Sequence, residues 1–353
     1  MTNRRKFIAA AAGTVGVLGA ADKSGSRLPV IGSGEHTYEV MHDWGTPPDR
    51  ITYGNTHAVV QDSERRVYIA HTVHASSKSN DTLLVFDEKG KFIRSWGPEF
   101  KGGAHGLHIR KEGREEFLYV VDTGKGRTSS VDPSHTWMVK MTLKGEEVFR
   151  IGYPKESPLY KTDAAGKPIT AFSPTNIAIA PNNDIYPSDG YGSSTISQYD
   201  SKGNYVRTFG GLGKEPGQLF KPHGLIVDTR GPEPILLVAD RSNFRLQTFT
   251  LDGRHIGFGG GIKRPCHFDE RNGVMLVPDL AARVTLLDRQ NQVILHLGED
   301  DSGTWEQLRT QSRDHFIPGK FVSPHGACFD HDGNIFVAEW VEVGRVTKLR
   351  KVS

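Results

Sequence analysis

The chain has 353 residues, of which 40 are glycine, 19 are proline and 36% are hydrophobic. This composition is typical of a turn-rich β protein, and no long segment has the apolar spacing of three and four residues that an amphipathic helix needs, which argues against a helical fold. The length suffices for one repeat-built domain or two ordinary ones, and the 44 basic and 41 acidic side chains nearly balance.

The first 21 residues have the composition of an export signal. A basic stretch at residues 4–6 precedes Phe7 and then an uncharged run of small and apolar residues. The order Arg-Arg-x-Phe resembles a bacterial twin-arginine signal, and the small residues favour cleavage after Ala20 or Ala21. We expect an exported protein, periplasmic or secreted, without a membrane segment after cleavage. An uncleaved membrane anchor is the alternative.

Cleavage would also remove the excess of positive charge. The signal carries three basic and no acidic side chains, so Lys plus Arg falls from 44 to 41 and equals the 41 Asp plus Glu. A neutral mature chain gives no reason to expect a nucleic-acid partner. The two cysteines, Cys266 and Cys328, are compatible with a disulfide or with two free thiols.

Six repeated units follow along the chain. In each, an apolar-alternating run ends in glycine, and after a loop a strand begins at a recurring position, here called the inner station. The inner stations are His57, His105, Asn176, His223, Cys266 and His325. The next strand ends on a polar residue, here called the closing residue. The closing residues are His71, Asp122, Asp189, Asp240, Asp279 and Glu339. A third strand and a hairpin turn, usually with glycine, follow, so each unit is predicted to be a four-stranded antiparallel meander.

Six such units predict an all-β fold, a six-bladed β-propeller of the NHL-repeat type. The run at residues 38–45 has the pattern of an outer strand but precedes every inner strand, whereas the last unit lacks an outer strand. We therefore expect the N-terminal strand to complete the last blade and close the ring, which hides sheet edges. Residues 22–37 are assigned to a linker and residues 38–353 to the propeller. A pair of β-sandwiches is the alternative.

Three inner stations carry a histidine followed by glycine. They are His105, His223 and His325, in units two, four and six. Alternate blades of a six-bladed ring are related by about 120°, so these side chains should meet at one mouth of the central channel. Three imidazoles suit a divalent transition metal, zinc first, and leave one position open for chemistry. The alternative is that each histidine only bonds a neighbouring blade. The roles of His57, which lacks the glycine, and of Cys266 stay open.

At these residues the chain resembles the peptidyl-α-hydroxyglycine α-amidating lyases, over most of residues 45–350. The likeness is carried by "SPTNIAIAPNNDIYPSDGYGSSTISQYD", "FKPHGLIVD", "LLVADRSNFRLQTF" and "PHGACFDHDGNIFVAEW". The resemblance implies a six-bladed propeller with zinc held by His105, His223 and His325. It also implies a catalytic tyrosine at Tyr191 in "SDGYG" and an active-site arginine at Arg241 in "VADRSN".

The reaction implied by this resemblance cleaves a carbinolamine to an amide and glyoxylate. The metal would act as a Lewis acid on the substrate hydroxyl or carboxylate. Tyr191 would act as general base, since nearby positive charge favours the phenolate. Arg241 would clamp a substrate carboxylate with two donors. The alternatives are structural roles, a channel aromatic for Tyr191 and a salt bridge to a neighbouring blade for Arg241.

The chain departs from the family pattern at several positions. Thr72 stands where the family has a second active-site arginine, and Ser323 replaces a methionine. Gly326 replaces the acid that the family associates with a structural calcium, so a calcium site is possible only without that ligand. The disulfide cysteines of the family are not matched either. The metal site is therefore better supported than the lyase chemistry.

The resulting hypothesis is an exported, metal-dependent, lyase-like enzyme acting on a small hydroxylated or carboxylated molecule, or on a peptide-derived one. The main alternative is a non-catalytic propeller that binds a protein or glycan through its top-face loops, with residues 153–172 and 299–321 as candidate surfaces. A calcium-dependent lactonase would need acidic and amide ligands at the axis, which Glu339, Asp240 and Asn176 match only loosely. The oligomeric state is not predicted.

Overall fold

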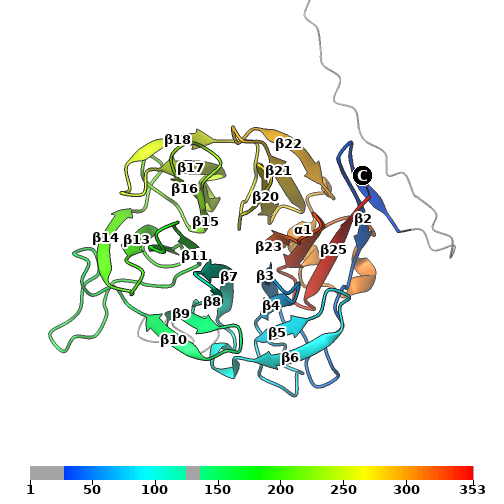
Figure 1. Ribbon diagram of the computed structural model, residues 1–353, viewed down its shortest axis with the longest axis horizontal. Coiled ribbons are helices and arrows are strands. Elements are labelled where there is room, and N and C mark those ends of the chain that lie inside the picture. The colour runs from blue at the N-terminus through cyan, green and yellow to red at the C-terminus, as the bar shows by residue number, and fades with distance from the viewer. Residues whose placement is uncertain (1–27, 125–135, 353) are drawn as a thin grey trace, which may run out of the picture.

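A computed structural model describes residues 28–124 and 136–352 of the chain. Its strands form six antiparallel sheets arranged radially around one axis, so the predicted six-bladed β-propeller is confirmed (Figure 1). The proposed signal at residues 1–21 lies outside the described residues and stays a prediction. Among the described residues, no helix has the length and apolarity needed to cross a membrane.

The first three blades follow one another in chain order. Blade 1 consists of β3 (Thr56–Gln61), β4 (Val67–His71), β5 (Leu83–Phe86) and β6 (Phe92–Trp96). Blade 2 consists of β7 (Ala104–Glu112), β8 (Glu115–Asp122), β9 (Trp137–Thr142) and β10 (Glu147–Ile151). Blade 3 consists of β11 (Asn176–Ile179), β12 (Ile185–Asp189), β13 (Thr195–Tyr199) and β14 (Tyr205–Gly210).

The last three blades complete the ring. Blade 4 consists of β15 (Pro222–Asp228), β16 (Ile235–Asp240), β17 (Arg245–Phe249) and β18 (His255–Gly259). Blade 5 consists of β19 (Asp269–Arg271), β20 (Val274–Asp279), β21 (Arg283–Leu287) and β22 (Val293–Leu297). Blade 6 consists of β23 (Pro324–Phe329), β24 (Ile335–Glu339), β25 (Arg345–Lys351), β2 (His36–Met41) and β1 (Val30–Ser33). The short helical elements are η1 (Pro98–Phe100), η3 (Arg241–Asn243), α1 (Trp305–Leu308) and η4 (Arg313–His315).

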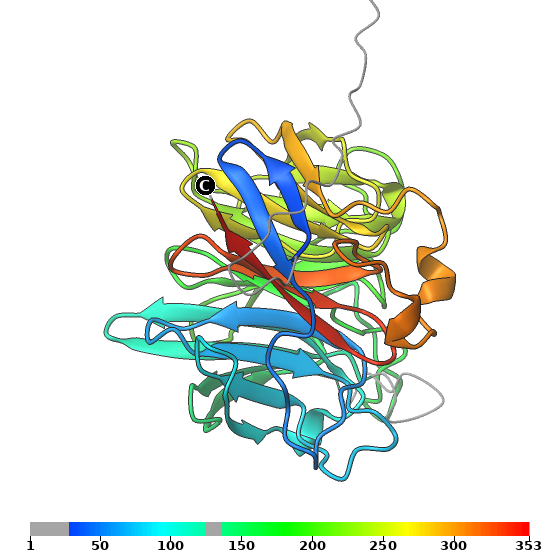
Figure 2. The same cartoon turned by 90° about the vertical axis from the view of Figure 1, so that its right-hand side faces the viewer.

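The first and last strands of the described residues close the ring in blade 6. β2 pairs antiparallel with β25, with Val40 opposite Leu349, which confirms the predicted closure (Figure 2). β1 then pairs with β2 as a fifth strand, in a segment where the sequence pattern gave no strand. Because strands from both ends share one sheet, the edges that an open ring would expose are satisfied within the chain.

The core lies between neighbouring blades. The second strand of each blade is covered on both faces, and side chains such as Ile69 in β4, Val238 in β16 and Val337 in β24 are fully buried. This double coverage explains why these strands are apolar without alternation. Burial of one such side chain contributes about 1.5–3 kcal/mol, so the interblade layers stabilise the ring.

The closing residues hold the loops that lead to the inner stations. In five blades the side chain of the closing residue accepts a hydrogen bond from the backbone N–H three residues before the inner station. These pairs are His71 with Gly54 (3.3 Å), Asp189 with Ser173 (2.7 Å), Asp240 with Phe220 (2.7 Å), Asp279 with Lys263 (2.6 Å) and Glu339 with Val322 (2.7 Å). In the four blades where the acceptor is a carboxylate, the bond is charge-assisted, short and strong, so it fixes where the inner strand begins.

Three of these carboxylates are also paired with arginines, and they include Asp240 and Glu339, which were considered as calcium ligands. Asp240 accepts from Arg245 at 2.7 Å, and Glu339 is paired with Arg345. Asn176, the third residue considered for a calcium-dependent lactonase, is bonded to His108 at 2.6 Å and to His267 at 2.9 Å. Because all three side chains are engaged with protein partners, they do not form the open oxygen-ligand cage that calcium requires.

Candidate metal centre at the channel mouth

The inner strands of blades 2, 4 and 6 bring their histidines to one point near the axis. The ring centroids of His105 and His223 are 4.8 Å apart, those of His105 and His325 are 4.6 Å apart, and those of His223 and His325 are 4.7 Å apart. All three side chains are at least 96% buried. The structure thus brings together the three residues that the sequence pattern selected.

A β-bulge aims these side chains at the axis. In β7 Ala104 lies opposite Asp122 while Gly106 lies opposite Val121, so His105 is an extra residue without a partner on β8. The same shift occurs in β23, where His325 is the extra residue. β15 has a register shift at the corresponding place. A bulged residue leaves the pleat alternation, and bulges commonly redirect a side chain toward a functional site.

Each histidine is oriented by a hydrogen bond to the next blade. In each case Nδ1 of the histidine donates to a backbone carbonyl oxygen. The pairs are His105 to Thr175 (2.7 Å), His223 to Cys266 (2.8 Å) and His325 to His57 (2.8 Å). A carbonyl oxygen can only accept, so Nδ1 carries the proton and Nε2 keeps the lone pair. A backbone carbonyl behind the imidazole is the usual arrangement for a metal-ligating histidine.

The glycine after each histidine makes this hydrogen bond possible. A Cβ on Gly224 would lie 2.5 Å from the carbonyl oxygen of Cys266, and one on Gly326 would lie 2.5 Å from the carbonyl oxygen of His57. A Cβ on Gly106 would lie 3.1 Å from the carbonyl oxygen of Thr175. The accepting carbonyl therefore approaches closely only because no side chain is present. The His-Gly dipeptide serves both purposes considered from the sequence, a bond to the neighbouring blade and an imidazole at the axis.

Tyr191 and Arg241 lie at the same cluster. Tyr191 follows β12, and its hydroxyl oxygen is 3.2 Å from Nε2 of His105 and 3.1 Å from Nε2 of His223. Arg241 begins η3, with Nη1 3.5 Å from that hydroxyl and its guanidinium carbon 5.3 Å from the tyrosine ring centroid. The guanidinium also contacts the thiol of Cys266. Both residues selected from the sequence therefore face the histidines.

The environment keeps the imidazoles uncharged. Burial lowers the pKa of His105 well below its usual range, and the neighbouring His325 and His57 lower it further. Burial also lowers the pKa of His223, assisted by the positive charge of Arg241. Neutral imidazoles can bind a cation without first losing a proton. A buried cluster of unprotonated nitrogens therefore favours the binding of a positive ion.

The donor set fits a transition metal. Donor atoms of His57, His105 and His325 all lie within 4.8 Å of one another, and so do those of His223, Cys266 and His325. The two groups share His325 and overlap at the axis. Nitrogen and sulfur donors suit zinc, copper, iron or nickel rather than calcium or magnesium. Cys266 and Cys328 are both free and buried, so no disulfide competes for the thiol.

The sequence pattern left the role of His57 open and did not identify Arg309. The ring centroid of His57 lies 4.7 Å from that of His105 and 4.6 Å from that of His325, so His57 belongs to the same cluster. Arg309 follows α1 in the segment before blade 6. This segment is not part of the repeated units, so the repeat pattern does not predict where it lies. Its guanidinium lies over the ring of Trp340, and its charge is one of the causes that lower the pKa of His325.

A second pair of histidines lies further along the channel. Nε2 of His108 donates to Oδ1 of Asn176, and Nδ2 of Asn176 donates to Nδ1 of His267. The two imidazole centroids are 4.9 Å apart. They line a cavity of about 310 Å³ formed by the inner strands. Their sequence signal was weak because neither residue occupies an inner station.

The structure also accounts for one departure from the lyase pattern. Gly326 stands where an acid is expected, and a Cβ there would lie 2.5 Å from the carbonyl oxygen of His57 and 2.7 Å from the Cα of Ala58. An acidic side chain has no room at this position unless the backbone of blade 1 moves. The carboxylate that the resemblance associates with calcium therefore has no counterpart here.

Comparisons with known proteins point to distant relatives. No family model matches the chain. A Caenorhabditis elegans protein named as a probable peptidyl-α-hydroxyglycine α-amidating lyase is 29% identical over 49% of this chain and 44% of its own length. The peptidyl-glycine α-amidating monooxygenase A of Xenopus laevis is 26% identical over 73% of this chain and 26% of its length, and human NHL repeat-containing protein 3 is 27% identical over 61% and 57%. The matches span less than two thirds of each relative.

Solved structures share the fold at lower sequence identity. A catalytically inactive virginiamycin B lyase from Staphylococcus aureus superimposes with a TM-score of 0.54 at 14% identity, over 89% of this chain and all of that one. A gluconolactonase from Xanthomonas campestris gives a TM-score of 0.53 at 11% identity, over 89% of each chain. These likenesses show the propeller fold alone. The distant sequence relatives of this chain are thus amidating-lyase-type and NHL-repeat proteins, and its own channel mouth carries a cluster of histidines able to hold a metal.

Proposed function

We propose that this protein is an exported metal-dependent lyase that cleaves a carbinolamide-type substrate, in which one carbon carries a hydroxyl and an amide nitrogen. One observation carries the proposal: the hydroxyl of Tyr191 lies within 3.2 Å of Nε2 of both His105 and His223, at a cluster able to hold a metal. A proton-transferring group beside a metal-binding cluster is what such a cleavage needs. The distant lyase relatives support the same reaction class.

The metal is proposed to be a divalent transition ion, zinc first, held by His105, His223 and His325. The Nδ1 bonds to the next blades hold each imidazole ready to bind through Nε2. When bound, the ion supplies a Lewis acid that lowers the pKa of a substrate hydroxyl. The three ring centroids lie within 4.8 Å of one another, and the donor atoms of His105 and of His223 each lie within 4.8 Å of that of His325.

Tyr191 would move the proton in the reaction. Acting as the phenolate, its oxygen would accept the proton of the substrate hydroxyl, the electron pair left behind would form a carbonyl, and the bond from that carbon to the amide nitrogen would break. Tyr191 would then return this proton to the nitrogen, so the products are an amide and an aldehyde, which is glyoxylate when the carbon also carries a carboxylate. No oxidant or water is consumed.

Two guanidinium groups would bind an anionic substrate. Arg241 is partly buried beside Tyr191. Arg309 lies over the ring of Trp340 and is close enough to Tyr191 to interact with it electrostatically. Guanidinium groups bind carboxylates through two parallel donors. Because Thr72 offers no cation at the position of the family's second arginine, Arg309 would supply the second positive charge from a different element.

Export and partners remain proposals of the same kind. The twin-arginine pattern and the small residues before Asp22 support transport to the periplasm or the medium, with cleavage after Ala20 or Ala21. The proposed partner is a small or peptide-derived substrate. Neither a nucleic acid nor a membrane is proposed as a partner of the mature chain.

The activity test is incubation of the metal-loaded mature protein with an N-acyl-α-hydroxyglycine, followed by measurement of glyoxylate. A Tyr191→Phe variant should retain its metal and lose about 10²–10⁴-fold in turnover, the usual contribution of a general base. Tyr205→Phe, which removes a hydroxyl bonded to Thr208 on an outer strand, is the matched control and should keep full activity.

Two results would contradict the proposal. If glyoxylate does not rise above the level of the metal-stripped protein, the lyase activity is wrong. If Tyr191→Phe turns over at the rate of the unaltered protein, the tyrosine is not the base. A folded protein that binds no metal in elemental analysis would favour the alternative, a non-catalytic propeller that binds a protein or glycan through its top-face loops.

A further inference from the structure

His57 stands in the metal cluster as a fourth imidazole. It occupies the inner station of blade 1, and it is the extra residue of a β-bulge in β3, between Thr56 opposite His71 and Ala58 opposite Ala70. Blade 1 thus uses the same device that aims His105 and His325 at the axis. The side chain of His57 is 93% buried, so it belongs to the interior of the channel mouth.

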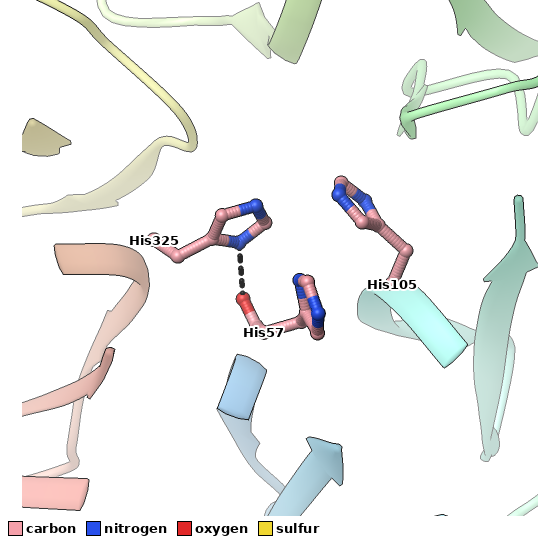
Figure 3. Close-up of side chains that lie close together, drawn as sticks. All are labelled: His57, His105 and His325. Atoms are coloured by element: carbon pink, nitrogen blue, oxygen red, sulfur yellow. Dashed lines mark hydrogen bonds between the residues drawn. The ribbon is translucent and has the colours of Figure 1, made fainter. Parts of the chain in front are cut away.

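The ring of His57 shares one space with two of the proposed ligands. Figure 3 shows the imidazoles of His57, His105 and His325 around a common gap, and their donor nitrogens all lie within 4.8 Å of one another. Two nitrogens on one tetrahedral ion are about 3.4 Å apart when the metal–nitrogen bonds are about 2.1 Å. Three donor atoms within 4.8 Å of one another would each have to move by less than about 1 Å to bind one ion.

The backbone ties His57 to a neighbouring ligand. The carbonyl oxygen of His57 accepts the Nδ1 proton of His325 at 2.8 Å, and the dashed line in Figure 3 marks this bond. Gly326 permits that contact, because a Cβ there would lie 2.5 Å from the same oxygen. The backbone of His57 is thus held against His325. The imidazole rings of these two residues also lie edge-to-face, with an interplanar angle of 89°.

Cys266 is the competing candidate for a fourth donor. Its sulfur belongs to the group with His223 and His325, but it also lies 3.6 Å from the carbonyl oxygen of Arg264 and contacts the guanidinium of Arg241. An imidazole can bind as the neutral group, whereas a thiol must lose its proton to become a strong ligand. The two donors would also give different spectra, which makes them distinguishable.

We propose that the metal centre is a four-histidine site in which His57 binds the ion together with His105, His223 and His325. This proposal rests on the metal centre of the proposed function and extends its donor set. Four imidazoles fill the positions of a tetrahedral ion, so the substrate must enter as a fifth ligand. Zinc accepts five ligands during catalysis, and copper, nickel and iron accept five or six.

The test uses the full mature chain, stripped with a chelator and titrated with Co²⁺ alone. His57→Ala should weaken Co²⁺ binding by about 100-fold. Losing a residue that only supports a ligand typically costs about 10–100-fold, and losing a ligand should cost at least as much. The visible absorption of bound Co²⁺ should shift, since a different donor takes the place of one imidazole. Pulsed electron paramagnetic resonance of the Cu²⁺ form should count one imidazole fewer than in the unaltered protein.

Matched variants separate binding from folding. His267→Ala removes another buried histidine of the same channel and should leave the affinity and spectra unchanged. His57→Gln keeps a side chain of similar size and should behave like His57→Ala, which covers the case in which the alanine variant does not fold. His223→Ala should abolish binding and serves as the reference for a lost ligand.

Three outcomes would overturn the four-histidine site. If both His57 variants keep the affinity and spectra while His223→Ala loses the metal, the centre has three histidines and the proposed enzyme function stands. A sulfur-to-cobalt charge-transfer band that disappears in Cys266→Ser identifies the thiol as the fourth donor instead. If the unaltered protein binds neither ion, the metal centre and the proposed function fail together.

Discussion

Replacing Gly224 by alanine tests whether the His-Gly dipeptide builds the metal centre. The added Cβ would lie 2.5 Å from the carbonyl oxygen of Cys266 and 2.7 Å from the Cα of His267. Both atoms belong to the backbone of the next blade, so no flexible side chain can yield. An ordinary contact needs at least about 3.4 Å, and blades 4 and 5 must therefore separate locally by nearly 1 Å.

The magnitude follows from two effects. Overpacking of a well-filled interior costs about 1–3 kcal/mol. Moving the Cys266 carbonyl also lengthens its 2.8 Å bond to Nδ1 of His223, and such a bond contributes about 0.5–1.5 kcal/mol. We expect the free energy of unfolding to fall by about 2–4 kcal/mol. Since the lost bond orients a proposed ligand, metal affinity should also fall by about 10–100-fold.

Thermal unfolding followed by circular dichroism measures the first effect, and metal titration measures the second. Gly257→Ala is the matched control, because it lies on β18 of the same blade and its Cβ would meet only Thr248 Oγ1, at 3.7 Å. If Gly224→Ala is as stable as Gly257→Ala and binds metal equally well, then the close approach of the blades does not orient His223, and the explanation given for the glycine is wrong.

The remaining predictions concern the second guanidinium and the buried histidines. Arg309→Met should raise KM for a carboxylated substrate about tenfold or more while kcat stays similar, because Arg309 would bind the carboxylate equally in the ground state and the transition state. An equal rise in KM for an uncharged substrate would contradict this role of Arg309. For the metal-free protein, burial lowers the pKa of His71 and of His108 to about 4, from about 6.5 in the unfolded chain. The unfolded chain therefore binds protons first, and the free energy of unfolding should be level above pH 6.5 and decline toward pH 4, by up to about 3 kcal/mol for each histidine. A flat profile of denaturant midpoints over that range would show that these imidazoles are not buried as neutral groups.

The sequence by itself determined the number of blades and the position of the proposed ligands along the chain. Glycine-ended outer strands, polar closing residues and hairpin turns are local patterns, and a local pattern repeated six times can be counted without coordinates. The missing outer strand of the last unit also fixed the ring closure, because β2 had no other sheet to complete. His105, His223 and His325 followed from the same count, since alternate blades of a ring face one axis.

Only the tertiary structure decided how the imidazoles are held and which other residues join them. The bond between His325 and the carbonyl of His57 joins residues 268 positions apart, and nothing in either local pattern specifies it. The β-bulges depend on the pairing of two strands, so the sequence of one strand does not reveal them. Arg309 comes from a segment outside the repeated units, so aligning those units could not predict its position in the fold. Contacts made across the ring depend on how its blades pack together, and that packing is what supplies His57 and the guanidinium of Arg309 to the channel mouth.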